Sequence, residues 1–331
     1  MKKYGLSLIV LTILLPVFLC SDVFARTWVY EYPVSTGGVA GLWPSIKRDA
    51  SGNLRIAYVG HGKLLYATGP GTWTIEVVNS EGVATGEAPQ WCSLAVAGTT
   101  PHIAYYDAKT KTLKHAWKSA SWQSEVVDSS VGVGKHTSIA VNSSGFPAIT
   151  YYDEVNDRLK YAYQDAMGWH IEVIATGCGR YNSLVIDSSG NAHVAYYDAN
   201  LTLRYARRTG SWTYETVDSR KFYGEMCSIA LNSSGYPCIA YRDGFNGRLN
   251  YAYKDAGGWH IEVVDSQDRT GFLPALAIGT DGVPRINYYR RAGYSDGVNW
   301  YALETWYAYK SGGVWQKQLI ERIKSTNDQW F

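Results

Sequence analysis

Three residues in the middle of the chain carry the groups that acid–base chemistry or the binding of an anion requires. His136 supplies an imidazole, Arg180 a permanent positive charge and Tyr181 a phenol, and each comes just before an apolar run. In an enzyme, His136 or Tyr181 would act as the base and Arg180 would neutralise a substrate carboxylate. In a binding protein, the same groups would hold an acidic sugar without changing it.

A sequence repeat defines the elements that would position these residues. The typical copy holds a Ser-led apolar strand, a turn, a Tyr-Tyr-Asp strand, a Leu-x-Tyr-Ala strand and a Trp-x-x-Glu strand; the first copy has Tyr58-Val59-Gly60 and the sixth Tyr288-Tyr289-Arg290 in place of Tyr-Tyr-Asp. Four short alternating strands, repeated at a spacing of roughly 45 residues, are typical of propeller blades, which bury their faces by stacking on each other. The copies begin at Ser45, Ser93, Ser138, Ser183, Ser228 and Ala275. The sequence therefore predicts an all-β chain, a β-propeller of four-stranded blades with six recognisable repeats, in one domain over residues 26–331.

The number of blades has two interpretations. The segment Trp28–Glu31 matches the Trp-x-x-Glu strand, yet the other three strands of a blade do not precede it. Such a strand often closes the ring by pairing with the last blade, because closure removes exposed sheet edges. The chain is then either a seven-bladed design that lacks part of its last blade or a ring of six. We expect six.

The repeat also brings the chemically interesting loops to one face. In a propeller, the loops before each first strand and the turns after each Tyr-Tyr-Asp open around the mouth of the central channel. We therefore expect a ring of side chains there, with the carboxylate of Glu225 nearby. The ring consists of Trp43, Trp91, His136, Tyr181 and Met226.

The Tyr-Tyr-Asp strand allows a second kind of site. Its Asp precedes a polar turn, where a carboxylate can accept hydrogen bonds from the backbone amides ahead. Alternatively, Tyr152 with Asp153 and Tyr197 with Asp198 form repeated sugar sites, since Tyr offers an apolar face and Asp accepts hydrogen bonds from hydroxyls. The outer-strand Glu, in contrast, recurs in almost every copy, so we interpret it as protection of a sheet edge, and the Trp before it as packing between blades.

The first 25 residues have the pattern of a bacterial-type secretory signal peptide. Lys2 and Lys3 precede an apolar run, and Val23-Phe24-Ala25 offers a small residue at the cleavage point. Cys20 would suit lipid attachment, but Leu19 stands where that reaction needs a small residue. The sequence thus predicts a secreted or periplasmic protein, and no other segment is apolar over the length of a membrane span.

The charge and the cysteine content limit the kinds of partner and ligand that the sequence predicts. Losing residues 1–25 would change the formal charge from +2 to about +1, and no Lys/Arg run offers a footprint for nucleic acid. Four cysteines would remain in an oxidising compartment, and Cys178 with Cys227 is the predicted disulfide. No zinc-type Cys/His spacing occurs, so we expect neither metal nor cofactor.

The turn before the outer strand resembles a shortened Asp-box, as in Asp165-Ala-Met-Gly168-Trp169 and Asp255-Ala-Gly-Gly258-Trp259. The chain is in this respect similar to sialidase-like propellers, in which this turn is a mark of the fold on the face away from the active site. Arg55-Ile-Ala and Arg285-Ile-Asn depart from the Arg-Ile-Pro motif of that family. The resemblance therefore implies a propeller that is lectin-like and not a sialidase.

Our leading hypothesis is an exported, noncatalytic propeller that binds a glycan or a cell-surface partner through the loops at the channel mouth. The first alternative is a carbohydrate-active enzyme, a polysaccharide lyase or glycosidase, with His136, Tyr181 and Arg180 at its centre. The second is a scaffold that presents loops to protein partners. Several identical ligand sites per chain would favour the lectin, and turnover abolished at one unique residue would favour the enzyme.

Overall fold

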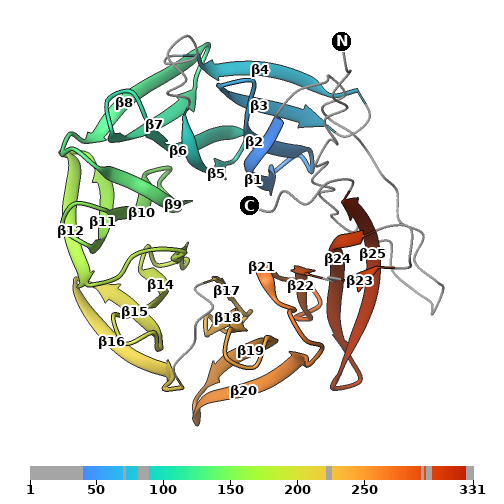
Figure 1. The fold of residues 1–331 in the computed structure, drawn as a ribbon. Coiled ribbons are helices and arrows are strands. Elements are labelled where there is room, and N and C mark those ends of the chain that lie inside the picture. Colours follow the sequence, from blue (N-terminus) through green and yellow to red (C-terminus); the bar gives the residue numbers. More distant parts are fainter. Residues whose placement is uncertain are drawn as a thin grey trace, which may run out of the picture.

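The chain folds as a six-bladed β-propeller. The computed structural model describes residues 40–69, 72–80, 89–220, 226–291, 294–295 and 300–325. These residues form six antiparallel sheets, which Figure 1 shows arranged in a ring around a central axis. The described residues contain no helix. The predicted fold and the expected number of blades are both confirmed.

The first three blades each come from one continuous stretch of four strands. Blade 1 comprises β1 (Ala40–Arg48), β2 (Leu54–Gly60), β3 (Lys63–Gly69) and β4 (Thr74–Asn79). Blade 2 comprises β5 (Gln90–Ala97), β6 (Thr100–Asp107), β7 (Thr112–Lys118) and β8 (Trp122–Asp128). Blade 3 comprises β9 (Val133–Val141), β10 (Pro147–Asp153), β11 (Arg158–Asp165) and β12 (Gly168–Thr176).

The last three blades follow the same order from the axis outward. Blade 4 comprises β13 (Ser183–Ile186), β14 (Ala192–Tyr197), β15 (Leu203–Thr209) and β16 (Ser211–Asp218). Blade 5 comprises β17 (Cys227–Leu231), β18 (Pro237–Asp243), β19 (Arg248–Asp255) and β20 (Gly258–Asp265). Blade 6 comprises β21 (Phe272–Ile278), β22 (Pro284–Arg290), β24 (Trp300–Ser311) and β25 (Val314–Ser325), with the two-residue strand β23 (Tyr294–Ser295) paired to β24.

Blade 6 supplies its own outer strand, β25, which pairs with β24. All six blades of the ring therefore have four strands without any contribution from the amino end. The segment Trp28–Glu31, which the sequence offered as a closing strand, lies outside the described residues, as does the predicted leader at residues 1–25.

The hydrophobic core is divided among the junctions between blades. Between blades 3 and 4, for example, Leu159 and Tyr161 of β11 pack with Val194 and Tyr196 of β14. The middle strands are buried on both faces, which explains why their sequences are almost continuously apolar. Each blade is therefore stabilised by its neighbours.

A repeated hydrogen bond explains the Ser that begins five of the six copies. The Ser138 hydroxyl oxygen accepts a hydrogen bond from the Leu184 amide in the inner strand of the next blade, at 3.0 Å. The same contact joins the other consecutive pairs of inner strands: Ser45 with Leu94, Ser93 with Ile139, Ser183 with Ile229 and Ser228 with Leu276. The sixth copy begins with Ala275 and has no hydroxyl for such a bond.

A second repeated contact joins the outer strands. Glu172 of blade 3 accepts hydrogen bonds from the indole of Trp212 and the guanidinium of Arg208, both in blade 4. Glu76, Glu215 and Glu262 bind a Trp and a Lys of the following blade in the same way. We predicted a protected sheet edge, whereas the carboxylate instead binds the next blade. The predicted packing of the Trp between blades is confirmed.

The predicted disulfide is wrong. Cys92, Cys178, Cys227 and Cys238 are all free thiols. Cys178 lies in the core between blades 3 and 4, while Cys227 packs against the core between blades 4 and 5. The sheet of blade 4 therefore lies between these two cysteines, which the spacing in the sequence alone did not reveal.

Candidate functional site

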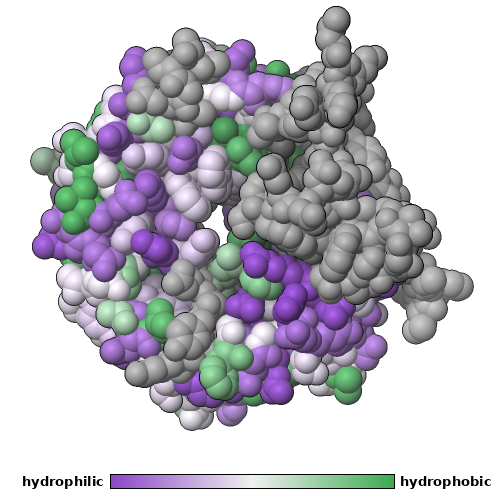
Figure 2. Space-filling model, viewed as in Figure 1, coloured by the Kyte–Doolittle hydropathy of each residue, from purple (hydrophilic) through white to green (hydrophobic). Residues whose placement is uncertain are grey.

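The predicted aromatic ring exists as an arc over blades 1 to 4. Ring centroids lie 5.4 Å apart for Trp43 and Trp91, 3.9 Å for Trp91 and His136, and 4.5 Å for His136 and Tyr181. All four side chains are half-buried and stand where the inner strand of their blade begins or just before it. We call these four residues the aromatic arc. Figure 2 shows the opening at the centre of the ring of blades.

The backbone of the arc has an unusual conformation. Trp43, Trp91, His136 and Tyr181 have φ between 46° and 53°, in the left-handed region that glycine adopts most easily. Leu273, at the same place in blade 6, has a φ of 47°. A large residue costs about 1 kcal/mol or more in this region, and its occurrence at Leu273 as well shows that the conformation belongs to the repeat.

Hydrogen bonds from the following blade hold each carbonyl group of the arc. The Cys92 thiol donates to the Trp43 oxygen at 2.9 Å, and the Asn182 amide donates to the His136 oxygen at 2.9 Å. The Thr137 hydroxyl and the Cys227 thiol bind the oxygens of Trp91 and Tyr181 in the same way. Cys92 and Cys227, which we considered for disulfides because of the expected oxidising compartment, therefore serve as hydrogen-bond donors through their thiols.

His136 is poorly suited to act as a base. Burial, together with the positive charges of Arg180 and Lys135, lowers the pKa of His136 to about 3. A general base works best when its pKa lies near the working pH. The imidazole is therefore neutral at pH 7 and behaves as a flat polar ring within the arc.

The remaining predicted mouth residues lie close to the arc. The Arg180 guanidinium lies 5.5 Å from the ring centroid of Tyr152, and the Tyr152 ring lies 6.2 Å from that of His136. The structure thus brings Arg180, Tyr152 and Tyr181 to His136, as the sequence suggested. Glu225 lies outside the described residues. Met226 is described, and its sulfur accepts a hydrogen bond from the Leu273 amide at 3.1 Å.

The Asp residues of the Tyr-Tyr-Asp strands cap turns. Asp153 is 2% exposed, and its Oδ1 accepts hydrogen bonds from the backbone and side-chain nitrogens of Asn156. Asp198 accepts from the amides of Asn200 and Thr202, and Tyr197 donates its hydroxyl proton to the Arg242 carbonyl. The geometry favours the structural interpretation of this motif over repeated sugar sites.

Blades 5 and 6 carry a different group of side chains at their junction. The guanidinium of Arg242 lies 4.0 Å from the ring centroid of Phe272, and that of Arg291 lies 4.5 Å from it. Arg242 replaces the second Tyr of the Tyr-Tyr-Asp strand, and Phe272 stands one residue before the arc position of blade 6. We call Arg242 and Arg291, with the Phe272 ring between them, the arginine pair. Our reading of the sequence missed it, although an Arg in place of a repeated Tyr was a visible signal.

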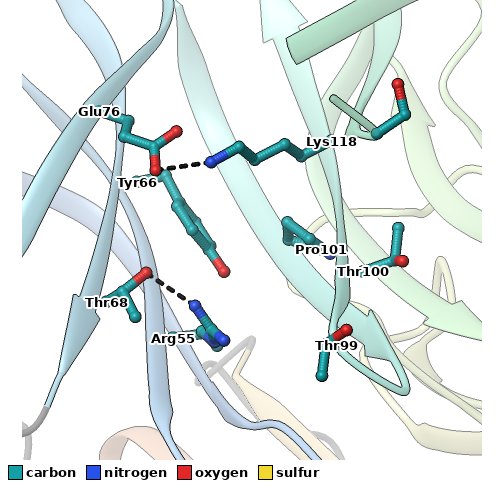
Figure 3. Close-up of a pocket in the computed structure, with 9 residues that line it drawn as sticks. Arg55, Tyr66, Thr68, Glu76, Thr99, Thr100, Pro101 and Lys118 are labelled. Atoms are coloured by element: carbon teal, nitrogen blue, oxygen red, sulfur yellow. Dashed lines mark hydrogen bonds and ion pairs between the residues drawn. The ribbon is translucent and has the colours of Figure 1, made fainter. Parts of the chain in front are cut away.

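A separate cavity of about 300 Å³ lies between blades 1 and 2. Figure 3 shows the Tyr66 hydroxyl turned toward it, with the Lys118–Glu76 ion pair (2.7 Å) and the Arg55–Thr68 hydrogen bond (2.9 Å) at its sides. Within the described residues, the buried Tyr66 hydroxyl makes no hydrogen bond of normal geometry. We call this cavity the interblade pocket.

One small residue opens the interblade pocket. Thr68 lies opposite Arg55 in the sheet of blade 1. The same place in the other blades holds a larger side chain: Trp117, Tyr163, Arg207, Tyr253 or Tyr309. Thr68 could not be singled out from the sequence, because its position is recognised only once the strands are in register.

The described residues contain no group of three or more His, Cys, Asp or Glu side chains arranged to hold a metal ion. They also contain no helix that could span a membrane.

The chain resembles solved propellers in fold while sharing little sequence with them. No family model and no curated protein matches it. AofleA from Arthrobotrys oligospora has a TM-score of 0.61 at 14% identity, over 87% of this chain and 89% of its own. The SapL1 lectin, solved in complex with alpha methyl fucoside, has a TM-score of 0.59 at 13% identity, with 86% and 96% covered.

A third structure is described as a fungal lectin with a six-bladed β-propeller fold and a novel fucose recognition mode, the lectin of Aleuria aurantia. Its TM-score is 0.54 at 13% identity, over 88% of this chain and 98% of its own. At such low identity these likenesses show the fold alone. The six blades in the description of the Aleuria aurantia lectin agree with the number found here.

Proposed function

We propose that this protein is a noncatalytic carbohydrate-binding β-propeller whose ligand lies against the aromatic arc at the channel mouth. The observation that carries the proposal is the contiguous arc itself, in which four rings follow one another at 3.9–5.4 Å on strained backbone. Aromatic rings present the flat apolar surface on which the C–H face of a sugar packs, with polar edges for its hydroxyls.

Two further observations support a binding function. SapL1 and the Aleuria aurantia lectin, which share the fold, are lectins whose descriptions name a fucoside or fucose. In addition, the only imidazole of the arc has a pKa of about 3, which makes proton abstraction at neutral pH inefficient. A lyase or glycosidase centred on His136, Tyr181 and Arg180 is therefore the weaker alternative.

We also propose that the protein is exported from the cytoplasm. A sugar-binding protein that carries the leader-like residues 1–25 would meet glycans outside the cytoplasm. Determination of the amino-terminal residue of the protein recovered from the cell envelope or medium tests this point. Cleavage near Arg26 is expected, and a mature protein that begins at Met1 would contradict export.

The function is tested by applying residues 26–331 to an array of glycans and polysaccharides. Selective retention of an intact glycan is expected, and Trp43→Ala and Tyr181→Ala, at the two ends of the arc, should each weaken it. Tyr66→Phe, which alters only the interblade pocket, is the matched control. If Tyr66→Phe abolished retention and the arc variants did not, the ligand would lie in the pocket, and the assignment to the mouth would be wrong.

A further inference from the structure

The arginine pair has a counterpart in another blade that is electrically balanced. At the junction of blades 2 and 3, the Lys135 ammonium lies 5.6 Å from the ring centroid of Tyr106 and forms an ion pair with Glu154 at 2.7 Å. The order of groups there is aromatic, cation and anion. Lys135 immediately precedes His136 in the arc, and Glu154 immediately follows the Tyr-Tyr-Asp strand of blade 3.

The same three repeat positions at the junction of blades 5 and 6 hold Arg242, Phe272 and Arg291. There the order is cation, aromatic and cation, so both ends are positive. Arg291 occupies the position of the carboxylate of Glu154. The chain has thus kept the three-membered stack while replacing its anion with a second cation.

The arginine pair has no carboxylate partner among the described residues. Among the described residues, the Arg242 side chain donates a hydrogen bond to the Thr270 carbonyl, at 3.2 Å, and forms no ion pair with a carboxylate. The nearby carboxyl groups have other partners: Asp243 binds the turn at Asn246, Asp268 lies beside Arg269, and Glu304 binds Arg290 and Arg322.

Electrostatics makes this arrangement costly for the unliganded protein. Burial, followed by the positive charge of Arg291, lowers the pKa of Arg242 below its usual value. The carboxylates of Asp243 and Asp268 offset only part of this pKa shift. Two like charges that share one aromatic ring repel each other, and an anion between them would remove that repulsion. Planar guanidinium groups bind carboxylate and sulfate oxygens with two parallel hydrogen bonds, which favours these anions over a single halide ion.

We propose that the arginine pair binds the acidic group of a glycan, the carboxylate of a uronic acid or the sulfate of a sulfated sugar. The inference rests on the proposed carbohydrate function and specifies its ligand class. In this arrangement, the arc holds the neutral rings of the glycan, while Arg242 and Arg291 bind its negative charge. Figure 2 shows hydrophilic side chains gathered over β21 and β22 beside the central opening, which suits a charged ligand.

The test measures binding of glucuronic acid, of glucose as its neutral counterpart, and of inorganic sulfate by calorimetry. Glucuronic acid should bind about tenfold more tightly than glucose, as expected for one additional charge-assisted contact. The advantage should shrink as sodium chloride is raised, because salt screens an exposed site. The relative affinities of glucuronic acid and sulfate distinguish a carboxylate ligand from a sulfate ligand.

The variant Arg291→Gln should abolish the difference between glucuronic acid and glucose. Its control, Arg48→Gln, removes one exposed positive charge from blade 1 and should preserve the difference. Arg291 lies on the surface, so this variant is expected to fold even where Arg242→Gln does not. Arg242→Lys, which keeps the charge and loses the planar fork, should retain part of the preference.

The outcomes separate this inference from the proposed function. If glucose and glucuronic acid bind equally, the inference is overturned while carbohydrate binding stands. If only sulfate binds, and Arg291→Gln abolishes that binding, the anion site is supported and the carbohydrate function is overturned. If no probe binds to the folded protein, both are overturned.

Discussion

Two sectors of the propeller, blades 1 to 4 and blades 5 and 6, use one scaffold for opposite chemistries. Over blades 1 to 4, four rings contact one another, and the cation Lys135 is balanced by Glu154. Over blades 5 and 6, the arc positions hold Met226 and Leu273, and two arginines flank a single ring. The hydrogen bonds that join the inner strands of successive blades are found in both sectors, whereas the side chains at the arc positions differ.

This difference shows where to look for function in a repeat protein. The strongly repeated residues, such as the leading Ser and the outer-strand Glu, join blade to blade. The positions that vary among copies, such as those of His136 and Phe272, are free to carry specificity because the joining contacts do not depend on them. Four predictions test this division, beginning with the largest expected effect.

Replacing Trp91 with Ala should break the aromatic sector. Its ring lies between those of Trp43 and His136, so its removal interrupts both contacts. We expect glycan affinity to fall by roughly 30-fold, about 2 kcal/mol, as for a central aromatic contact residue. Leu273→Ala, at the same position in blade 6 and 55% exposed, is the control. Equal losses in the two variants, measured by titration calorimetry, would remove the distinction between the sectors.

Exchanging one charge at each junction should remove the preference for an acidic sugar from one sector and create it in the other. Arg291→Glu places a carboxylate where blade 3 has Glu154, so Arg242 gains an internal partner, and the preference for an acidic sugar, about tenfold, should disappear. Glu154→Arg should create an anion preference beside Lys135. Affinities for glucuronic acid and glucose measure both changes. If Arg291→Glu bound glucuronic acid as well as the unchanged protein does, the anion would have to bind elsewhere.

Removal of the Ser that joins two inner strands should lower stability without changing the ligand binding of either sector. Ser138→Ala deletes the acceptor of the Leu184 amide, and we expect the free energy of unfolding to fall by about 1 kcal/mol in urea titrations. Ser143→Ala, in an exposed turn of the same blade, serves as the reference. A loss no larger than that of Ser143→Ala would show that the repeated Ser is not a significant contact between blades.

The last prediction concerns the dependence of stability on pH. The pKa of His136 is about 3 in the folded protein and 6.5 in its usual state. As pH falls from 6.5 toward 3, the unfolded chain therefore binds the proton first, and stability declines through this group; above 6.5 the group contributes nothing. His136→Phe should lose less stability than the unchanged protein between pH 7 and pH 5, measured by thermal unfolding. Identical losses would mean that His136 is not shielded from protonation.

Much of the candidate site could be predicted because it follows the repeat. The residues Trp43, Trp91, His136 and Tyr181 are equivalent in sequence, and equivalent positions in a propeller meet around the axis, so their proximity required only the correct architecture. The role of Asp153 as a turn residue was also foreseen as one of two interpretations, since Asp before a polar turn bonds the amides ahead.

Other features could not be foreseen because they join residues of different blades. The bond from Trp212 to Glu172, the free thiols of Cys178 and Cys227, and the pocket opened by Thr68 all depend on which face of one sheet meets the next. A repeat shows which residues are equivalent, but it does not show how far one blade is rotated and displaced against its neighbour.

The sequence by itself determined the all-β class, the six repeats and the residues that gather at the mouth, because periodic apolar strands can be buried in few ways. Only the tertiary structure decided that Arg242 and Arg291 share one ring with no carboxylate paired to them among the described residues, whereas Lys135 has Glu154. The physical reason is that charge balance is set by distances of a few ångströms between separate blades, and the order of residues along one chain does not contain those distances.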